Sequence, residues 1–442
     1  MLRKSSPTRA THLTDKGILL KSPPLGGLFV FETIQSVYTY IYSMITFLKN
    51  LILPISFLVS NIIGAGMFAL PFVFQQSGLV VGIFYLVFFG VLAAIIHLLY
   101  ADIVLRTNET RLQFPGYIKK YLGKNAGFFS SILVCITLLF TLTAYLVLSS
   151  SFLHIIIPAL SPLVAMFLFW ALATITIFIS IKHTAIFDTI TAAITIIAIG
   201  TIFAYWGIAF PFEASLFPIV NFEHAFLPFG PVLFSLIGFS AIPALVAYTR
   251  KESVSFVHMK RAIIWGSLLP AFFYFLYTVS IWGLSSSVSP DSLSGLVDTV
   301  PFSILITLSI LGFVSLWDSY SAVGRDINKL LEYEWLVTPA NALVIVASTP
   351  LILYFLGFQN FITLVSAIGG ILFSIWGILI ILAWKKAIRV HLPSVKFSTF
   401  YVSGHTYSIV AAIPSFIINL LLVVFAGGII YEAIQLIGLL IY

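Results

Sequence analysis

Two short stretches inside apolar runs of the chain contain glycine and proline in the same order. The first reads GMFALP (66–71) and the second reads GFSAIP (238–243), so both follow the pattern Gly-x-x-Ala-(Leu or Ile)-Pro. In a helix interior, glycine costs about 1 kcal/mol and proline about 3 kcal/mol relative to alanine. We therefore predict that the helix is interrupted at both places, which frees peptide N–H and C=O groups to bind a ligand. The alternative is a kink that only allows close packing.

A broken helix offers two kinds of binding group. The N-terminus of a half-helix presents N–H groups and a partial positive charge, which suit a carboxylate. The C-terminus of a half-helix and the carbonyls of the unwound segment suit a cation or an ammonium group. A small zwitterion matches both kinds of group at once.

The composition places these helices in a membrane. The chain has 442 residues, of which 60% are hydrophobic and 8% are charged, whereas a soluble chain has about 45–50% apolar and about 25% charged residues. A spanning helix needs roughly 20 apolar residues. We predict an all-α polytopic membrane protein with eleven spans, which lie near 51–73, 78–101, 126–150, 162–181, 184–206, 229–249, 262–284, 301–320, 338–356, 360–384 and 407–436.

The basic residues predict the orientation. With the N-terminus in the cytoplasm, all 22 Lys and Arg residues fall into the N-terminal region and the cytoplasmic loops, and the outer loops carry acidic residues instead. A bias of this kind sets the orientation of spanning helices. An odd number of spans then puts the C-terminus outside. Topology thus accounts for the net charge of +7, and we expect no nucleic-acid partner.

The two glycine-proline stretches lie 172 residues apart, in the first and the sixth predicted span. A repeat of five spans is odd-numbered, so its second copy enters the membrane from the opposite side and the repeat is inverted. Interrupted helices at matching positions of two inverted halves point to the binding site of a transporter.

The chain therefore divides into segments of different kinds. Residues 28–48 carry polar side chains every three or four positions, which indicates an amphipathic helix lying on the inner leaflet; a first helix stacked under the bundle is the alternative. The predicted segments are a disordered basic cytoplasmic tail (1–24), the amphipathic interfacial helix (25–48), the first five-helix repeat (49–206), an outer loop (207–228), the second repeat (229–384), a cytoplasmic loop (385–406) and the eleventh span (407–442).

Three stretches of the sequence resemble a known family. NIIGAGMFALP (61–71) is similar to the first-helix signature of the amino acid/auxin permeases and of the hydroxy and aromatic amino acid permeases. LFSLIGFSAIPALVAYTRKE (233–252) and KRAIIWGSLLPAFFYFLY (260–277) resemble the sixth and seventh helices of both groups. Both belong to the amino acid/polyamine/organocation (APC) superfamily, so the resemblance implies a LeuT-type fold of five plus five inverted helices, with helices 1 and 6 discontinuous.

The resemblance also implies a substrate site on the unwound segments. Backbone groups of the first helix would meet the substrate carboxylate, those of the sixth would meet the ammonium group and side chain, and a third-helix tyrosine would close over the substrate. The residues in these positions are Gly64, Ala65, Gly66 and Met67, then Gly238, Phe239, Ser240 and Ala241, and then Tyr145. For Tyr145, packing between helices is the alternative.

A coupling site is implied between the first and eighth helices. The carbonyls of Ser60 and Ile63 would face a second set of side chains, Ser315, Asp318 and Ser319, which share one helical face. A carboxylate replaces a hydroxyl at Asp318, which favours a proton over sodium there; the alternative is a pair with Arg325 at the cytoplasmic surface. His97 is a second candidate for proton binding, or a hydrogen-bonded structural histidine.

These observations predict a secondary active transporter that carries a neutral, preferably aromatic, amino acid with a proton or a sodium ion. No phosphate-binding loop, His-Glu-x-x-His or Gly-x-Ser-x-Gly motif occurs in the sequence, so we expect neither an enzyme nor a cofactor or metal beyond the coupling ion. The expected location is the plasma (inner) membrane, with the lipid bilayer as its surroundings and no pattern that specifies an oligomeric state. A non-transporting amino acid sensor and a channel are the alternatives.

Overall fold

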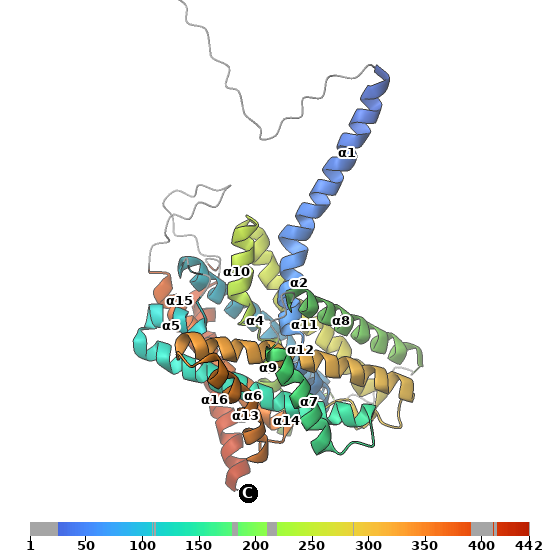
Figure 1. The fold of residues 1–442 in the computed structure, drawn as a ribbon, viewed down its shortest axis with the longest axis vertical. Coiled ribbons are helices and arrows are strands. Elements are labelled where there is room, and N and C mark those ends of the chain that lie inside the picture. Colours follow the sequence, from blue (N-terminus) through green and yellow to red (C-terminus); the bar gives the residue numbers. More distant parts are fainter. Residues whose placement is uncertain are drawn as a thin grey trace, which may run out of the picture. The chain divides into compact units, whose positions relative to one another are not determined.

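The computed structural model of the chain describes residues 25–107, 109, 112–178, 184–209, 219–285, 287–389, 410 and 413–441, and no β-strand occurs among them. Helices make up most of this part of the chain (Figure 1). The α-helices that form the spans are α2 (Leu53–Ile62), α3 (Leu70–Ser77), α4 (Leu79–Thr107), α6 (Lys124–Ile156), α7 (Pro162–Phe178), α8 (Thr184–Ala209), α9 (Phe229–Leu236), α10 (Ala241–Lys251), α11 (Phe256–Leu284), α12 (Phe302–Glu334), α13 (Pro339–Phe355), α14 (Phe361–Ala367), α15 (Ser374–Ala387) and α16 (Ser415–Ile441).

The chain divides into two units, residues 1–48 and residues 49–442. The described part of the first unit is α1 (Leu25–Phe47), which is followed by the π-helical turn η1 (Leu48–Ile52). On α1, the hydroxyls of Ser43 and Thr46 donate to backbone carbonyls of the same helix, at 2.8 and 2.7 Å. The predicted tail, 1–24, lies outside the described residues.

Each predicted span overlaps described helices, but the count of eleven is not confirmed. Among the described residues, nine helical stretches are long and apolar enough to cross a membrane, and the predicted fourth and ninth spans overlap the shorter apolar helices α7 and α13, of 17 residues each. The first apolar window begins at Ser36 instead of residue 51. The eighth span was predicted to end at residue 320, but α12 continues to Glu334.

Both predicted helix breaks are present. The first span leaves the helix after Ile62 and resumes as the 3-10 turn η2 (Ala65–Ala69) before α3. The sixth span leaves the helix after Leu236 and resumes with α10 at Ala241. The tenth span contains an unpredicted irregularity, the π-helical turn η6 (Ile368–Phe373) between α14 and α15.

The packing of the second unit follows the repeat. The third helix, α6, packs along its equivalent in the second repeat, α12. The seventh helix, α11, packs against α2 and α4, and α9 packs against η6. An unpredicted short helix, α5 (Phe114–Leu122), lies between α4 and α6 in sequence and packs against α6 and α15.

Candidate functional site

The two helix breaks lie against each other, and glycine makes this contact possible. A Cβ atom on Gly238 would lie 2.6 Å from Cγ1 of Ile62, and a Cβ atom on Gly66 would lie 2.7 Å from Cα of Ser235. Each distance is shorter than any van der Waals contact, so a side chain at either glycine would push the two broken spans apart. The structure therefore brings together the two segments that the sequence pattern predicted separately.

The imidazole of His97, on α4, supports the second break. The backbone N–H of Gly238 donates to Nε2 of His97 at 3.1 Å, and Nδ1 of His97 lies 2.8 Å from Oγ of Ser267. The Ser267 hydroxyl donates to the carbonyl of Ile263 at 2.7 Å, so it accepts from His97. Because Nε2 is an acceptor, the network assigns the imidazole proton to Nδ1. His97 is fully buried and makes the hydrogen bonds expected of a structural histidine, the alternative given for it above. Its role in coupling stays a prediction.

A single hydroxyl from α11 connects the two breaks. The Tyr274 hydroxyl lies 2.8 Å from the carbonyl oxygen of Ile62 and 3.2 Å from that of Ser235. These carbonyls belong to the C-terminal ends of α2 and α9, where helical partners are lacking. Tyr274 therefore stabilises both half-helix ends with one donor.

The predicted substrate residues are nearly all buried around this junction. Ala65, Met67, Phe239 and Ala241 are at most 4% exposed. Phe239 stacks on Trp376 of α15 with ring centroids 5.4 Å apart, and its edge meets the ring of His97. Two differ: Gly64 is partly buried, and Ser240 is exposed.

Tyr145 lies near the junction without joining its hydrogen bonds in the described structure. It projects from α6 and is 7% exposed. Its predicted closure over a substrate stays a prediction.

Among the predicted coupling residues, Ser319 approaches the first break. A Cβ atom on Gly64 would lie 3.2 Å from Oγ of Ser319, so α12 approaches the unwound backbone. Ile63 is extended (ψ 109°), which turns its carbonyl out of the α2 hydrogen-bond pattern. The Ser60 hydroxyl donates to the carbonyl of Phe57 at 2.9 Å. Ser315 is buried, and Asp318 is partly buried.

An apolar cavity borders η2 on the side of α8 and α12. Its volume is about 20 Å³, which is room for about one water molecule. Among the predicted substrate residues, only Met67 lines it. The lining residues are Met67, Phe68, Thr195, Ala198, Ile199, Ile202, Tyr277, Leu293, Leu308, Leu311 and Gly312.

Comparison with known families decides the class of protein. Residues 54–282 match the family described as transmembrane amino acid transporter protein. The chain belongs to this family. The APC-type resemblance seen in the sequence is thereby confirmed, and the family is one of transporters, not enzymes. A search of curated protein sequences gives no match.

Solved structures confirm the LeuT-type fold of this amino acid transporter. MhsT, in complex with L-phenylalanine, is 14% identical with a TM-score of 0.63, over 85% of this chain and 98% of that one. Mhp1, a nucleobase-cation-symport-1 family transporter in a closed conformation with bromovinylhydantoin bound, is 13% identical with a TM-score of 0.55, over 86% and 90%. A manganese transporter of Eremococcus coleocola is 12% identical with a TM-score of 0.53, over 89% and 95%.

Three side chains of the transporter site were missed by sequence reasoning. Ser267 and Tyr274 lie seven residues apart in the quoted seventh-helix stretch, so they share one face of α11. That spacing is the signal that could have found them. Ser292, in the loop between α11 and α12, donates to the carbonyl of Phe68 in η2; no local pattern marks it.

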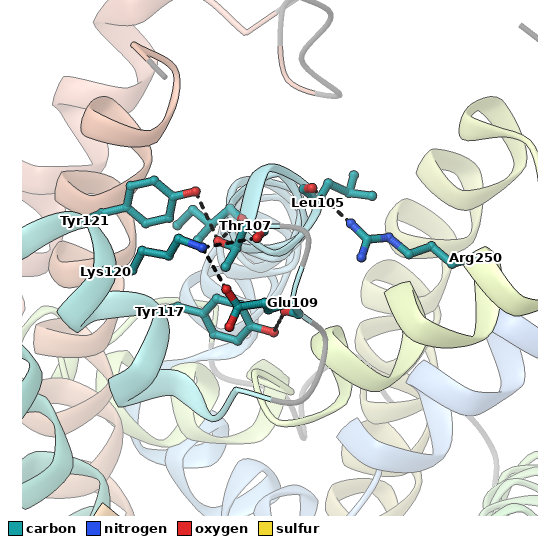
Figure 2. A network of polar contacts seen from close by, with 8 residues as sticks. Leu105, Thr107, Glu109, Tyr117, Lys120, Tyr121 and Arg250 are labelled. Carbon is teal, nitrogen blue, oxygen red and sulfur yellow. Dashed lines mark hydrogen bonds and ion pairs between the residues drawn. The ribbon is translucent and has the colours of Figure 1, made fainter. Parts of the chain in front are cut away.

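A polar network holds the end of α4 that is distant from the breaks (Figure 2). Arg250, at the end of α10, donates to the carbonyl of Leu105 at 2.9 Å. From α5, the Lys120 ammonium group meets the carboxylate of Glu109 at 3.0 Å, and the Tyr117 hydroxyl donates to the Glu109 carbonyl at 2.7 Å. Burial raises the pKa of Tyr117, so its hydroxyl keeps the proton that it donates. The network thus connects the second half of the sixth span to α4.

Among the described residues, no group of three or more His, Cys, Asp or Glu side chains is arranged to hold a metal ion.

Proposed function

We propose that this transporter carries a neutral amino acid across the membrane together with a cation, by alternating access. One observation carries the proposal: the two broken spans pack against each other, with Gly66 against Ser235 and Gly238 against the side chain of Ile62. N–H groups at the start of η2 have no partner within that turn and suit a carboxylate. Carbonyl groups of the second break suit an ammonium group. Met67 and Phe239 add apolar surface for a neutral side chain.

The substrate proposal favours aromatic amino acids. Phe239 is already part of a cluster with Trp376 and Phe373, and aromatic rings gain from such neighbours. The L-phenylalanine held by MhsT, a protein of the same fold, supports including it in a test panel.

The coupling proposal places the cation between the first break and α12. The carbonyls of Ser60 and Ile63 would face Ser315, Asp318 and Ser319, and the close approach of Gly64 to Ser319 supports this arrangement. The ion would be Na⁺ or H⁺. Replacing Asp318 with Asn should abolish gradient-driven uptake. Asp326→Asn on the same helix, where the exposed carboxylate lies 3.9 Å from Lys329, is the matched control and should transport normally.

The orientation proposal puts the N-terminus in the cytoplasm, the C-terminus outside and the protein in the plasma membrane. The basic residues near the ends of α4, α10 and α15 support it. Cysteine labelling from each side of the membrane, at position 124 and at position 222, would test it.

Counterflow tests the proposed function. Proteoliposomes preloaded with an unlabelled amino acid should accumulate the same labelled amino acid, and the panel should be repeated under separate pH and sodium gradients. A sensor would bind without exchange, and a channel would equilibrate without accumulation. Either result would contradict the proposal.

A further inference from the structure

A buried carboxyl group lies outside the five-plus-five core, on α16. Glu432 is 4% exposed, and its side chain lies on a surface made of glycine. A Cβ atom on Gly370 would lie 2.1 Å from Cγ of Glu432, and a Cβ atom on Gly230 would lie 2.8 Å from its Oε1. The carboxyl group therefore occupies space that two glycines leave open for it.

These glycines belong to interrupted parts of the sixth and tenth spans. Gly230 is the second residue of α9, the first half of the broken sixth span, so Oε1 of Glu432 lies at the N-terminal end of that helix. Gly370 lies in the π-helical turn η6. A Cβ atom on the adjacent Gly369 would lie 1.9 Å from the carbonyl oxygen of Gly230. The eleventh, tenth and sixth spans thus meet at one carboxyl group.

The surroundings supply no positive charge in the described structure. The elements that pack against α16 are α9, α14, η6 and α15, and of these only α15 has titratable side chains, Lys385 and Lys386. Lys385 donates to Asn419, which is 13 residues from Glu432 and therefore about 20 Å away along the helix. The titratable groups that face Glu432 are the phenols of Tyr85 on α4 and Tyr431 on α16.

We propose that Glu432 is a proton-binding site whose occupancy is coupled to the movement of α9, an inference that rests on the proposed transport function. The carboxylate lies beside Gly230 and attracts the positive N-terminal end of α9. Binding of one proton from water converts the carboxylate to a neutral carboxylic acid and weakens that attraction, so that α9 can move relative to α16 and η6. Release of the same proton to water restores the contact.

The test compares wild type, Glu432→Gln and the control Glu223→Gln in proteoliposomes, by counterflow and by uptake under a pH gradient. For one proton per substrate, wild type and the control should accumulate substrate by about tenfold for each pH unit. Glu432→Gln, which keeps the size and hydrogen-bonding of the side chain, should lose this accumulation. Its counterflow should persist at a rate that no longer varies with pH.

Accumulation and a pH profile like those of wild type in Glu432→Gln would overturn the inference. A uniform loss of rate in Glu432→Gln with an unchanged pH profile would also overturn it, because it would indicate a packing role only. A second measurement needs no variant: a pH-sensitive dye inside wild-type liposomes that hold no substrate should report acidification during net substrate uptake. Net uptake without acidification, by protein that performs counterflow, would contradict the proton site and leave the proposed transport intact, whereas absence of counterflow would contradict the transport function itself.

Discussion

At the first break only Ile63 and Gly64 leave the helix before the chain resumes as η2, whereas at the second break four residues, 237–240, separate α9 from α10. The first break is short, and Ser319 of α12 approaches its backbone at Gly64. The second is longer, and a side chain from another helix, His97, accepts its Gly238 N–H. Tyr274 serves both breaks, since its hydroxyl contacts a carbonyl at the end of α2 and one near the end of α9.

Two breaks with the same sequence pattern are thus supported by different partners. The pattern sets where the helix fails, because glycine and proline act on the local backbone. Support for the freed groups comes from α4 and α11, the second spans of the two repeats, which contribute different side chains, His97 from α4 and Tyr274 from α11. We infer that the first break is held mainly by backbone packing and the second mainly by a hydrogen-bond network.

The largest effect is expected from Gly66→Ala. Its new Cβ would lie 2.6 Å from Oγ and 2.7 Å from Cα of Ser235, and backbone cannot rotate away as a side chain can. Overpacking of this kind costs about 1–3 kcal/mol, so the counterflow rate should fall by about ten- to a hundredfold. Gly90→Ala on α4 is the matched control, since its Cβ would lie 3.5 Å from its nearest neighbours, in ordinary contact. Equal losses in the two variants would contradict the packing account of the first break.

Tyr274→Phe should affect both breaks. It leaves the carbonyls of Ile62 and Ser235 without this donor, and a buried unsatisfied group costs about 1–3 kcal/mol. Substrate binding should weaken by about tenfold, measured as competition in counterflow. The control is Tyr354→Phe on α13, a helix that packs against α6, α7 and α12. If Tyr274→Phe binds substrate like wild type, the hydroxyl does not hold the breaks.

His97 variants separate support from coupling at the second break. His97→Leu removes the acceptor for the Gly238 N–H and should lower counterflow by about tenfold, equivalent to about 1.4 kcal/mol. His97→Gln keeps an acceptor and a donor and should retain most of the rate and all of the response to a pH gradient. Loss of the pH response in His97→Gln, with counterflow intact, would instead assign the coupling proton to His97.

The smallest effect is expected far from both breaks, at Arg250. Arg250→Ala removes the hydrogen bond to the Leu105 carbonyl, which should lower the free energy of unfolding by about 1 kcal/mol. Thermal unfolding of the purified protein measures this loss. Substrate affinity should stay as in wild type, because no residue of the breaks is touched. A large loss of affinity would show that the distant network sets the geometry of the site.

Much of this architecture follows from the sequence, because its signals are local. Apolar runs predicted where the described helices lie, though not all their bounds, and Gly-Pro patterns predicted both breaks. The turn η6 was missed because no proline follows Gly369 and Gly370 as it does at the two breaks. The role of these glycines depends on their contact with Gly230. Tyr274 lies 212 residues from Ile62 along the chain, so no sequence window contains both. Glu432 was missed for a similar reason, because its neighbours on α9 and η6 lie far from it along the chain.

The most direct test of the account uses chemical derivatives of whichever amino acid gives the strongest counterflow. Its methyl ester lacks the carboxylate, and its N-acetyl derivative lacks the ammonium group. If unwound peptide groups at Gly66 and Gly238 bind both ends of a zwitterion, neither derivative should compete with the labelled amino acid. Competition by both derivatives at the concentration of the parent would contradict the account.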